Sequence, residues 1–159
     1  MQIEAIGTAA RRADLIPGDC FFFHDGKQSA FAIWSKEEEG GHTAAIVFSR
    51  EGGDRLPWAA TAGLPHTILL TRPLLLRSDP TSVTFGNEVP LGNLITAGGS
   101  FYLAAALGRI DVVTINIVTG MTENIPNTGS FVSFSRWAAG IVEGERWIPV
   151  FEFPLSPPR

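Results

Sequence analysis

Cysteine and basic residues are scarce in this chain, and their scarcity excludes several kinds of site. Cys20 is the sole cysteine among 159 residues, which rules out an intrachain disulfide and a Cys-x-x-Cys metal site. Lysine and arginine number 12 against 16 acidic residues, and Arg11-Arg12 is the sole adjacent basic pair. Contacts with phosphates need clustered cations, so we expect neither a nucleic-acid partner nor binding to an anionic membrane.

Long apolar runs and export signals are also missing. No stretch approaches the ~18 apolar residues that a membrane-spanning helix requires. Residues 1–14 contain no apolar segment of the kind that forms the centre of a signal peptide. We therefore expect a cytoplasmic protein that does not enter a membrane.

Charge is low for a chain of this size. Charged residues make up 18% of the sequence and apolar residues 45%, whereas roughly 25% charge is usual in globular proteins. A small domain with so few charges has apolar surface to cover, which another copy or a protein partner can do. The composition therefore favours a homo-oligomer or a protein partner over a monomer with a Ser, Thr, Asn and Gly surface.

Short apolar runs separated by turn residues make up most of the sequence. The strongest signal is Asp25-Gly26 between two β-prone runs, CFFFH and SAFAIWS, which is typical of a hairpin with a type I′ turn. The chain contains 17 glycines and 11 prolines, spaced closely enough to end each run after a few residues. The sequence predicts a mainly β protein, a single-domain β-sandwich or β-barrel over residues 1–153 with one or two short helices. We expect residues 154–159 to form an extended Pro-rich tail.

The expected strands are Gln2–Ile6, Asp19–His24, Gln28–Ser35, His42–Arg50, Arg55–Thr61, His66–Arg72, Ser82–Phe85, Ile110–Thr119, Ser130–Arg136, Gly140–Glu143 and Arg146–Phe153. Turns are expected at Glu51–Asp54 and Glu143–Glu145. The residues Val113, Ile115 and Ile117 share one face of a strand, which we expect to be buried.

Helix is expected at few places. Ser100–Leu107 is the best candidate, with Ser100 as N-cap and Gly108 at its end, although the same residues suit a strand. Single turns are expected at Ser35–Glu38 and within Thr8–Asp14. Pro73 interrupts an apolar run and predicts a bend or a sheet edge. We find no internal repeat in the sequence.

Three histidines, His24, His42 and His66, are the potential ligands of a metal. Two histidines and a carboxylate can hold a transition metal on a β scaffold. No pair of these histidines has the one-residue or four-residue spacing that is typical of metal ligands. We therefore expect no metal and no cofactor, and keep the three histidines as the alternative.

Tryptophans suggest a different kind of site. Trp58 and Trp137 lie in a loop-like stretch and at a strand end, where an exposed indole can stack on a sugar ring. Trp34 and Trp147 lie in strong strand patterns and are expected in the core. Trp58 and Trp137 are therefore the candidate ligand-binding residues.

One local pattern resembles a known family. Residues 15–19, Leu-Ile-Pro-Gly-Asp, precede an apolar strand, and residues 41–47, Gly-His-Thr-Ala-Ala-Ile-Val, open another. This order is similar to the strand–strand unit of NlpC/P60-type papain-like hydrolases, in which the second strand opens with the catalytic histidine. The resemblance implies that His42 is that histidine. Family members place a nucleophilic cysteine at a helix N-terminus, whereas Cys20 lies within a strand, and Ser100 stands at the position of the permuted members. The implied protein is a degenerate hydrolase centred on His42, which we expect to lack the family's activity. An enzyme centred on His42, with Cys20 or Ser100 as nucleophile, is the further alternative.

The leading hypothesis is non-enzymatic. No nucleophile–base motif, phosphate loop or metal spacing is present, while the apolar content is high. We expect a structural, assembly or ligand-binding domain that acts as a homo-oligomer or with a protein partner. The alternatives are a small-molecule or carbohydrate-binding β module and the degenerate hydrolase.

Overall fold

The computed structural model of the chain describes residues 6–24, 29–37, 42–48, 57–126 and 130–155. Of these residues 61% lie in strands and 5% in short helical turns, which confirms the mainly β prediction. The helical turns are 3-10 turns at Arg12–Asp14 and Pro80–Ser82. The strands are β1 (Gly7–Arg11), β2 (Cys20–His24), β3 (Ser29–Glu37), β4 (Thr43–Phe48), β5 (Trp58–Ala60), β6 (Thr67–Thr71), β7 (Leu75–Ser78), β8 (Val83–Gly86), β9 (Leu94–Ala97), β10 (Ser100–Leu107), β11 (Asp111–Asn116), β12 (Met121–Thr122), β13 (Phe131–Phe134), β14 (Trp137–Glu143) and β15 (Arg146–Phe153).

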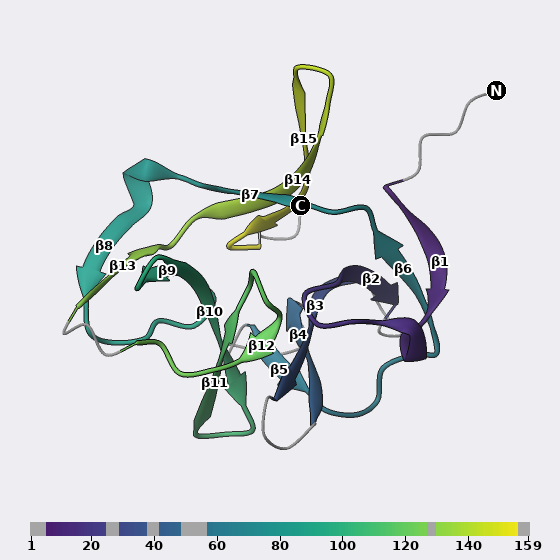
Figure 1. The fold of residues 1–159 in the computed structure, drawn as a ribbon, viewed down its shortest axis with the longest axis horizontal. Helices are drawn as coiled ribbons and strands as arrows, with labels where there is room; N and C mark the ends of the chain where they lie inside the picture. Colours follow the sequence, from purple (N-terminus) through teal and green to yellow (C-terminus); the bar gives the residue numbers. More distant parts are fainter. Residues whose placement is uncertain (1–5, 25–28, 38–41, 49–56, 127–129, 156–159) are drawn as a thin grey trace.

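Six strands close into a barrel, in the order β3, β4, β5, β10, β11 and β12 (Figure 1). Within β3–β5 and within β10–β12 the neighbours are antiparallel and consecutive in the chain. Two parallel pairings join these units, Trp58 with Ala106 and Met121 with Lys36. Of the sandwich and the barrel that the sequence allowed, the chain forms the barrel.

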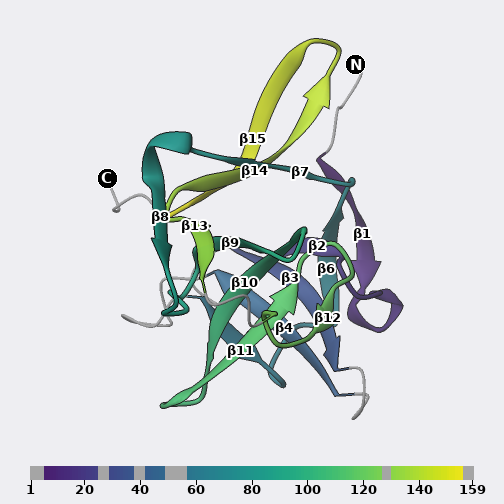
Figure 2. The same ribbon diagram turned by 60° about the vertical axis from the view of Figure 1, so that its left-hand side comes forward.

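Further strands extend the sheet on both sides of the barrel. On one side β2, β6 and β1 continue from β3, and on the other β9, β13 and β8 continue from β10 (Figure 1). A separate three-stranded sheet of β7, β14 and β15 lies across the top in this view. Figure 2 shows the hairpin of β14 and β15 projecting beyond the rest of the chain.

Strands β1–β7, the first half, are repeated by strands β8–β14, the second half. Each pairing of the first half recurs in the second half with the same direction and the same register. For example, β2 pairs with β3 and β6 as β9 pairs with β10 and β13. Each parallel closure joins a strand of one half to a strand of the other: β5 pairs with β10, and β12 pairs with β3. The last strands of the two halves, β7 and β14, pair with each other. The prediction of no internal repeat is therefore wrong, whereas β15 has no counterpart.

Backbone contacts at the barrel closures repeat in the same way. The N–H of Gly18 donates to the carbonyl of Trp34 at 2.9 Å, and the N–H of Gly92 donates to that of Ala104, also at 2.9 Å. Gly18 and Gly92 occupy equivalent positions before β2 and β9, and their φ angles are +92° and +76°. This is the left-handed region that favours glycine. Most other equivalent positions differ in residue type, so the sequence concealed the repeat.

The main core lies inside the barrel and beneath the three-stranded sheet. Its buried side chains come from both halves: Phe31, Ile33, Ile46, Phe48, Leu94, Leu103, Ala105, Ile115, Trp137, Ala139 and Phe151. The ring of Phe151 on β15 stacks on Phe31 with centroids 4.4 Å apart. A second cluster covers the outer face of the first half, where β3 is buried on both faces.

Three helix predictions differ from the structure. Ser100–Leu107 is strand β10, because β9 and β11 satisfy its backbone and its alanines fit between two packed faces. Ser35 belongs to β3, where its hydroxyl lies 2.9 Å from the Thr122 hydroxyl, instead of capping a helix. Within Thr8–Asp14 only Arg12–Asp14 is helical, since Gly7–Arg11 pairs with β6.

Several local predictions are confirmed. The strands that flank Asp25-Gly26 pair up to His24 with Ser29, although residues 25–28 lie outside the described part. The turn after Glu143 is a tight hairpin, with Gly144 at a φ of +61°. The turn expected at Glu51–Asp54 falls on residues that the structure does not describe. Where the chain is described, no helix has the length and apolar character needed to cross a membrane.

Candidate functional site

Cys20 and His42, the pair that a cysteine hydrolase requires, lie apart. Cys20 faces Ile33 across β2 and β3, while the carbonyl of His42 accepts from the N–H of Glu37 at 2.8 Å. Ile33 and Glu37 are four residues apart on β3, which is about 13 Å along a strand. A thiolate must be within hydrogen-bond reach of its imidazole base, so this arrangement brings no nucleophile to His42.

The surroundings of Cys20 also oppose nucleophilic chemistry. Burial, with a smaller contribution from the Asp19 carboxylate, raises the pKa of Cys20 to about 12. The thiol therefore stays protonated at neutral pH.

Ser100 and His42 lie at opposite ends of the barrel. β4 is antiparallel to β5, which is parallel to β10, so β4 and β10 run in opposite directions. His42 precedes the first residue of β4, and Ser100 is the first residue of β10. The structure also places Ser100 in a strand, which offers no helix dipole to activate its hydroxyl.

The three histidines do not converge. His24 faces Ser29 at the start of β3, whereas His42 lies beside Glu37 at its end, about 26 Å away along the strand. His66 precedes β6, and its carbonyl accepts from the N–H of Arg12. Over the described residues, no group of three or more His, Cys, Asp or Glu side chains is placed to hold a metal ion.

Trp58 and Trp137, the tryptophans predicted to bind a ligand, are less exposed than expected. Trp137 is 3% exposed, and its Nε1 donates to the carbonyl of Gly92 at 2.8 Å, so the expected exposure is wrong. Trp58 is half-buried against the cluster on the first half. Its Nε1 is buried and finds no hydrogen-bond acceptor among the described residues. Trp147, expected in the core, is only partly buried and lies against the guanidinium of Arg77, 4.2 Å from its ring centroid.

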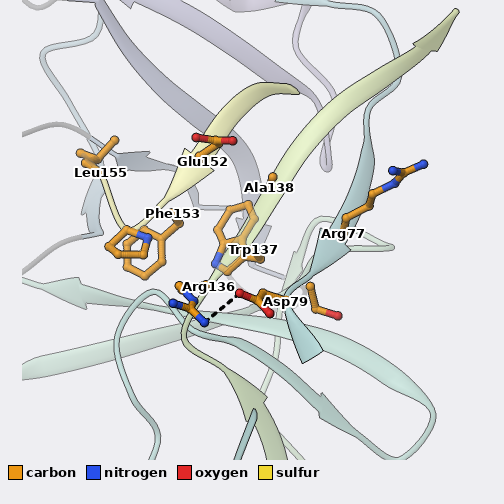
Figure 3. Close-up of a pocket in the computed structure, with 10 residues that line it drawn as sticks. Arg77, Asp79, Arg136, Trp137, Ala138, Glu152, Phe153 and Leu155 are labelled. Atoms are coloured by element: carbon orange, nitrogen blue, oxygen red, sulfur yellow. Dashed lines mark ion pairs between the residues drawn. The ribbon is translucent and has the colours of Figure 1, made fainter. Parts of the chain in front are cut away.

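A pocket of about 520 Å³ opens where β7 and β15 end and β14 begins (Figure 3). Its walls combine apolar and charged side chains: Arg77, Ser78, Asp79, Arg136, Trp137, Ala138, Glu152, Phe153, Pro154 and Leu155. Figure 3 shows Arg136 and Asp79 meeting beside Trp137, with Arg77 pointing away. The lining contains two arginines and two carboxylates, so the pocket has no excess of either charge.

Asp79 and Arg136 form a polar junction between this pocket and the start of β8. Nη2 of Arg136 lies 2.9 Å from Oδ2 of Asp79 and donates to the Thr81 hydroxyl at 2.6 Å. The hydroxyl and backbone N–H of Thr81 both donate to Asp79. These bonds, with the nearby Arg136 charge, hold the pKa of Asp79 below its ordinary value. Asp79 is therefore ionised at neutral pH and fixes the guanidinium at this end of β8.

β8 is an exposed sheet edge without charge. Its residues Val83–Gly86 pair with β13 on one side, and no described strand pairs with the other side. Every residue from 83 to 89 is exposed, and Phe85 has 79% of its surface accessible. An uncharged apolar edge is a template for pairing with another strand.

The other sheet edges carry features that oppose such pairing. β15 contains Pro149, which has no N–H to donate, together with the charged residues Arg146 and Glu152. β1, the counterpart of β8, ends at Arg11 and has Ala9 where β8 has Phe85. β7, the remaining edge, contains the charged residue Arg77, so β8 is the one edge strand described that has no charge.

Sequence reasoning did not identify Phe85, Glu88 or Arg136 as site residues. Ser82–Phe85 was predicted as a strand, and the strand is confirmed from Val83 to Gly86. Its position at an edge depends on strand order, for which the sequence has no local signal. The one signal in the sequence was a run of uncharged, β-prone residues, 83–86, followed by Asn87-Glu88.

Comparison with protein-family models, with curated proteins and with solved structures finds no match to this chain.

Proposed function

We propose that this protein is a non-enzymatic structural or assembly subunit that acts by self-association. One observation carries the proposal: eight of the eleven large exposed hydrophobic residues in the described part lie between residues 83 and 118. They are Val83, Phe85, Val89, Phe101, Leu107, Ile110, Val112 and Val118. These residues are close together in the sequence, and exposed apolar surface is characteristic of protein–protein contact.

The charge distribution supports the same function. Residues 83–126 contain four charged residues, Glu88, Arg109, Asp111 and Glu123. Surface that is buried on association is depleted in charge at its centre. The second half therefore has the composition of a contact surface, whereas the site residues expected of an enzyme are dispersed.

Mass measurement across a dilution series tests this proposal. We expect light scattering and native mass spectrometry to report a homo-oligomer at micromolar concentration that persists in high salt, because an apolar contact is little screened. A protein that is monomeric at every concentration would contradict the proposal.

Ligand binding in the pocket at the ends of β7, β14 and β15 is a second candidate. Its volume of about 520 Å³ lies within the range of roughly 300–1,000 Å³ that is usual for small-molecule sites. A thermal-shift screen of small molecules and a glycan array test it, with Ala138→Leu, which narrows the pocket, as the variant. We expect a true ligand to lose its stabilising effect on this variant, and a screen without hits contradicts the candidate.

A further inference from the structure

We propose that β8 of one copy pairs antiparallel with β8 of a second copy across a two-fold axis. The inference rests on the proposed function, because it names the surface through which self-association takes place. A two-fold contact uses the same patch on both copies, so the strand must be complementary to itself. Three features of the described residues meet this requirement.

The first feature is an open and uncharged strand. Val83–Asn87 contains no charged residue and no proline. Pairing of two β8 strands therefore brings no like charges together within the strand, and every residue of it has a main-chain N–H that can donate. The side facing away from β13 has no strand partner among the described residues. A second β8 would continue the sheet there with main-chain hydrogen bonds.

The second feature is the exposed aromatic ring near the centre of the strand. Phe85 is 79% exposed, and antiparallel pairing about the middle of β8 brings it directly or diagonally opposite Phe85 of the second copy. Cross-strand aromatic pairs stabilise antiparallel sheets. Val83 lies on the same face and extends the apolar contact.

The third feature is opposite charge at the two ends of β8. Glu88 follows the strand and is exposed, whereas Arg136, which is also paired with Asp79, is held beside Thr81 at the beginning. In an antiparallel pair centred on β8, Glu88 of one copy faces residues 80–82 of the other, where the guanidinium lies. The two-fold axis forms this ion pair twice. Parallel pairing would instead bring the two Glu88 carboxylates together.

Head-to-tail pairing of β8 with β1 fits these residues less well. β1 has Ala9 in place of Phe85, and it contains the charged residue Arg11, whereas β8 is uncharged. Such a contact would lose the aromatic pair. Repetition of it would also produce an open chain of subunits instead of a closed dimer.

Cross-linking through single cysteines tests the geometry. We expect Thr84→Cys, near the proposed axis, to give a covalent dimer with a short bismaleimide in a Cys20→Ala background, which removes the native thiol. Thr8→Cys is the matched control, since Thr8 occupies the equivalent position on β1. The result that overturns the inference is a cross-link that forms only when the two variants are mixed, which would indicate head-to-tail assembly.

Substitutions at the contact provide the independent measurement. We expect Phe85→Asp to raise the dimer dissociation constant about 100-fold, as for a central contact residue, with unchanged folding because Phe85 is exposed. Glu88→Arg should weaken the dimer less. Leu75→Asp, at an exposed position on β7, is the control and should have no effect.

The outcomes separate the two proposals. An oligomer that survives Phe85→Asp and does not cross-link through Thr84→Cys overturns the β8 contact and leaves self-association standing. A wild-type protein that is monomeric throughout overturns both proposals.

Discussion

The two halves share strand order and register but differ in what covers them. Phe31 and Phe101 occupy equivalent positions on β3 and β10, yet Phe31 is 2% exposed and Phe101 is 43% exposed. The difference comes from β15, which has no counterpart and stacks Phe151 on Phe31. The two halves thus share one backbone architecture. The additional strand β15 buries Phe31 in the core, whereas no described strand covers Phe101, the equivalent residue of the second half.

The outer faces of the two halves differ in the same direction. On the first half nine buried residues form one cluster, which includes Leu64 from the connection between β5 and β6. On the second half the corresponding cluster has three buried residues, Ile95, Ala97 and Tyr102. The first half is therefore covered by its own chain. The second half has the surface that self-association would cover.

The largest effect expected from this comparison is at the equivalent phenylalanines. Phe31→Ala should lower the free energy of unfolding by about 4 kcal/mol, because it leaves a cavity beneath Phe151 and Phe48. Phe101→Ala should cost about 1 kcal/mol, since its ring is partly exposed. Chemical denaturation of both variants at a concentration where the protein is monomeric measures the difference. Equal losses would mean that the two positions are covered alike.

The glycines that precede β2 and β9 give the next effect. Both have positive φ, so alanine costs roughly 1 kcal/mol of backbone strain at either position. At Gly92 an added Cβ would also overlap the Phe153 ring and Pro57, whereas at Gly18 the nearest atom is 3.8 Å away. We expect Gly92→Ala to cost about 3 kcal/mol in total, with overpacking as the additional part.

Thermal unfolding of Gly18→Ala and Gly92→Ala, side by side, checks this expectation. Because the strain is common to both variants, the difference between them isolates the contact with Phe153 and Pro57. A Gly18→Ala variant as unstable as Gly92→Ala would show that the strain alone determines the loss.

What the sequence could predict depends on how close together in the chain the interacting residues lie. Hairpins at Asp25-Gly26 and Gly144-Glu145 were accessible, because their signals lie within a few residues. Closure of the barrel was not, since β12 is two residues long and pairs with Lys36 and Glu37 of a distant strand. Ser100–Leu107 has alanines and a capping serine, and sheet partners on both sides override that helical propensity.

The candidate site was out of reach for a related reason. The β8 strand itself was predicted, but its exposed edge follows from the order of all the strands. The approach of Arg136 to Thr81 likewise depends on how the chain passes from β13 to β14. The residues that were predicted, His42 and Cys20 among them, were selected by type, and type does not determine distance.

A buried hydroxyl pair gives a smaller effect. The Ser35 and Thr122 hydroxyls lie 2.9 Å apart at the closure between β3 and β12, whereas the equivalent closure between β10 and β5 has Ala105 and Ala59. Ser35→Ala should cost about 1 kcal/mol, because it leaves the Thr122 hydroxyl without this partner. The double variant with Thr122→Ala copies the other closure and should recover part of the loss. A double-mutant cycle by urea denaturation measures the coupling, and additive losses would contradict it.

The smallest effect at neutral pH concerns Cys20, which occupies the position of Leu94 in the other half. Burial raises the pKa of Cys20 to about 12 from an ordinary value near 9, so the folded chain retains a proton that the unfolded chain loses between these pH values. The free energy of unfolding should therefore be independent of this group below pH 9 and should fall as the pH rises from 9 toward 12. Cys20→Ala removes the group, so its stability should fall less than that of the wild type across this range. Parallel profiles for the two proteins would contradict this expectation. They would mean that the thiol ionises as readily in the folded chain as in the unfolded one, and that the first half admits solvent where the second is sealed by Leu94.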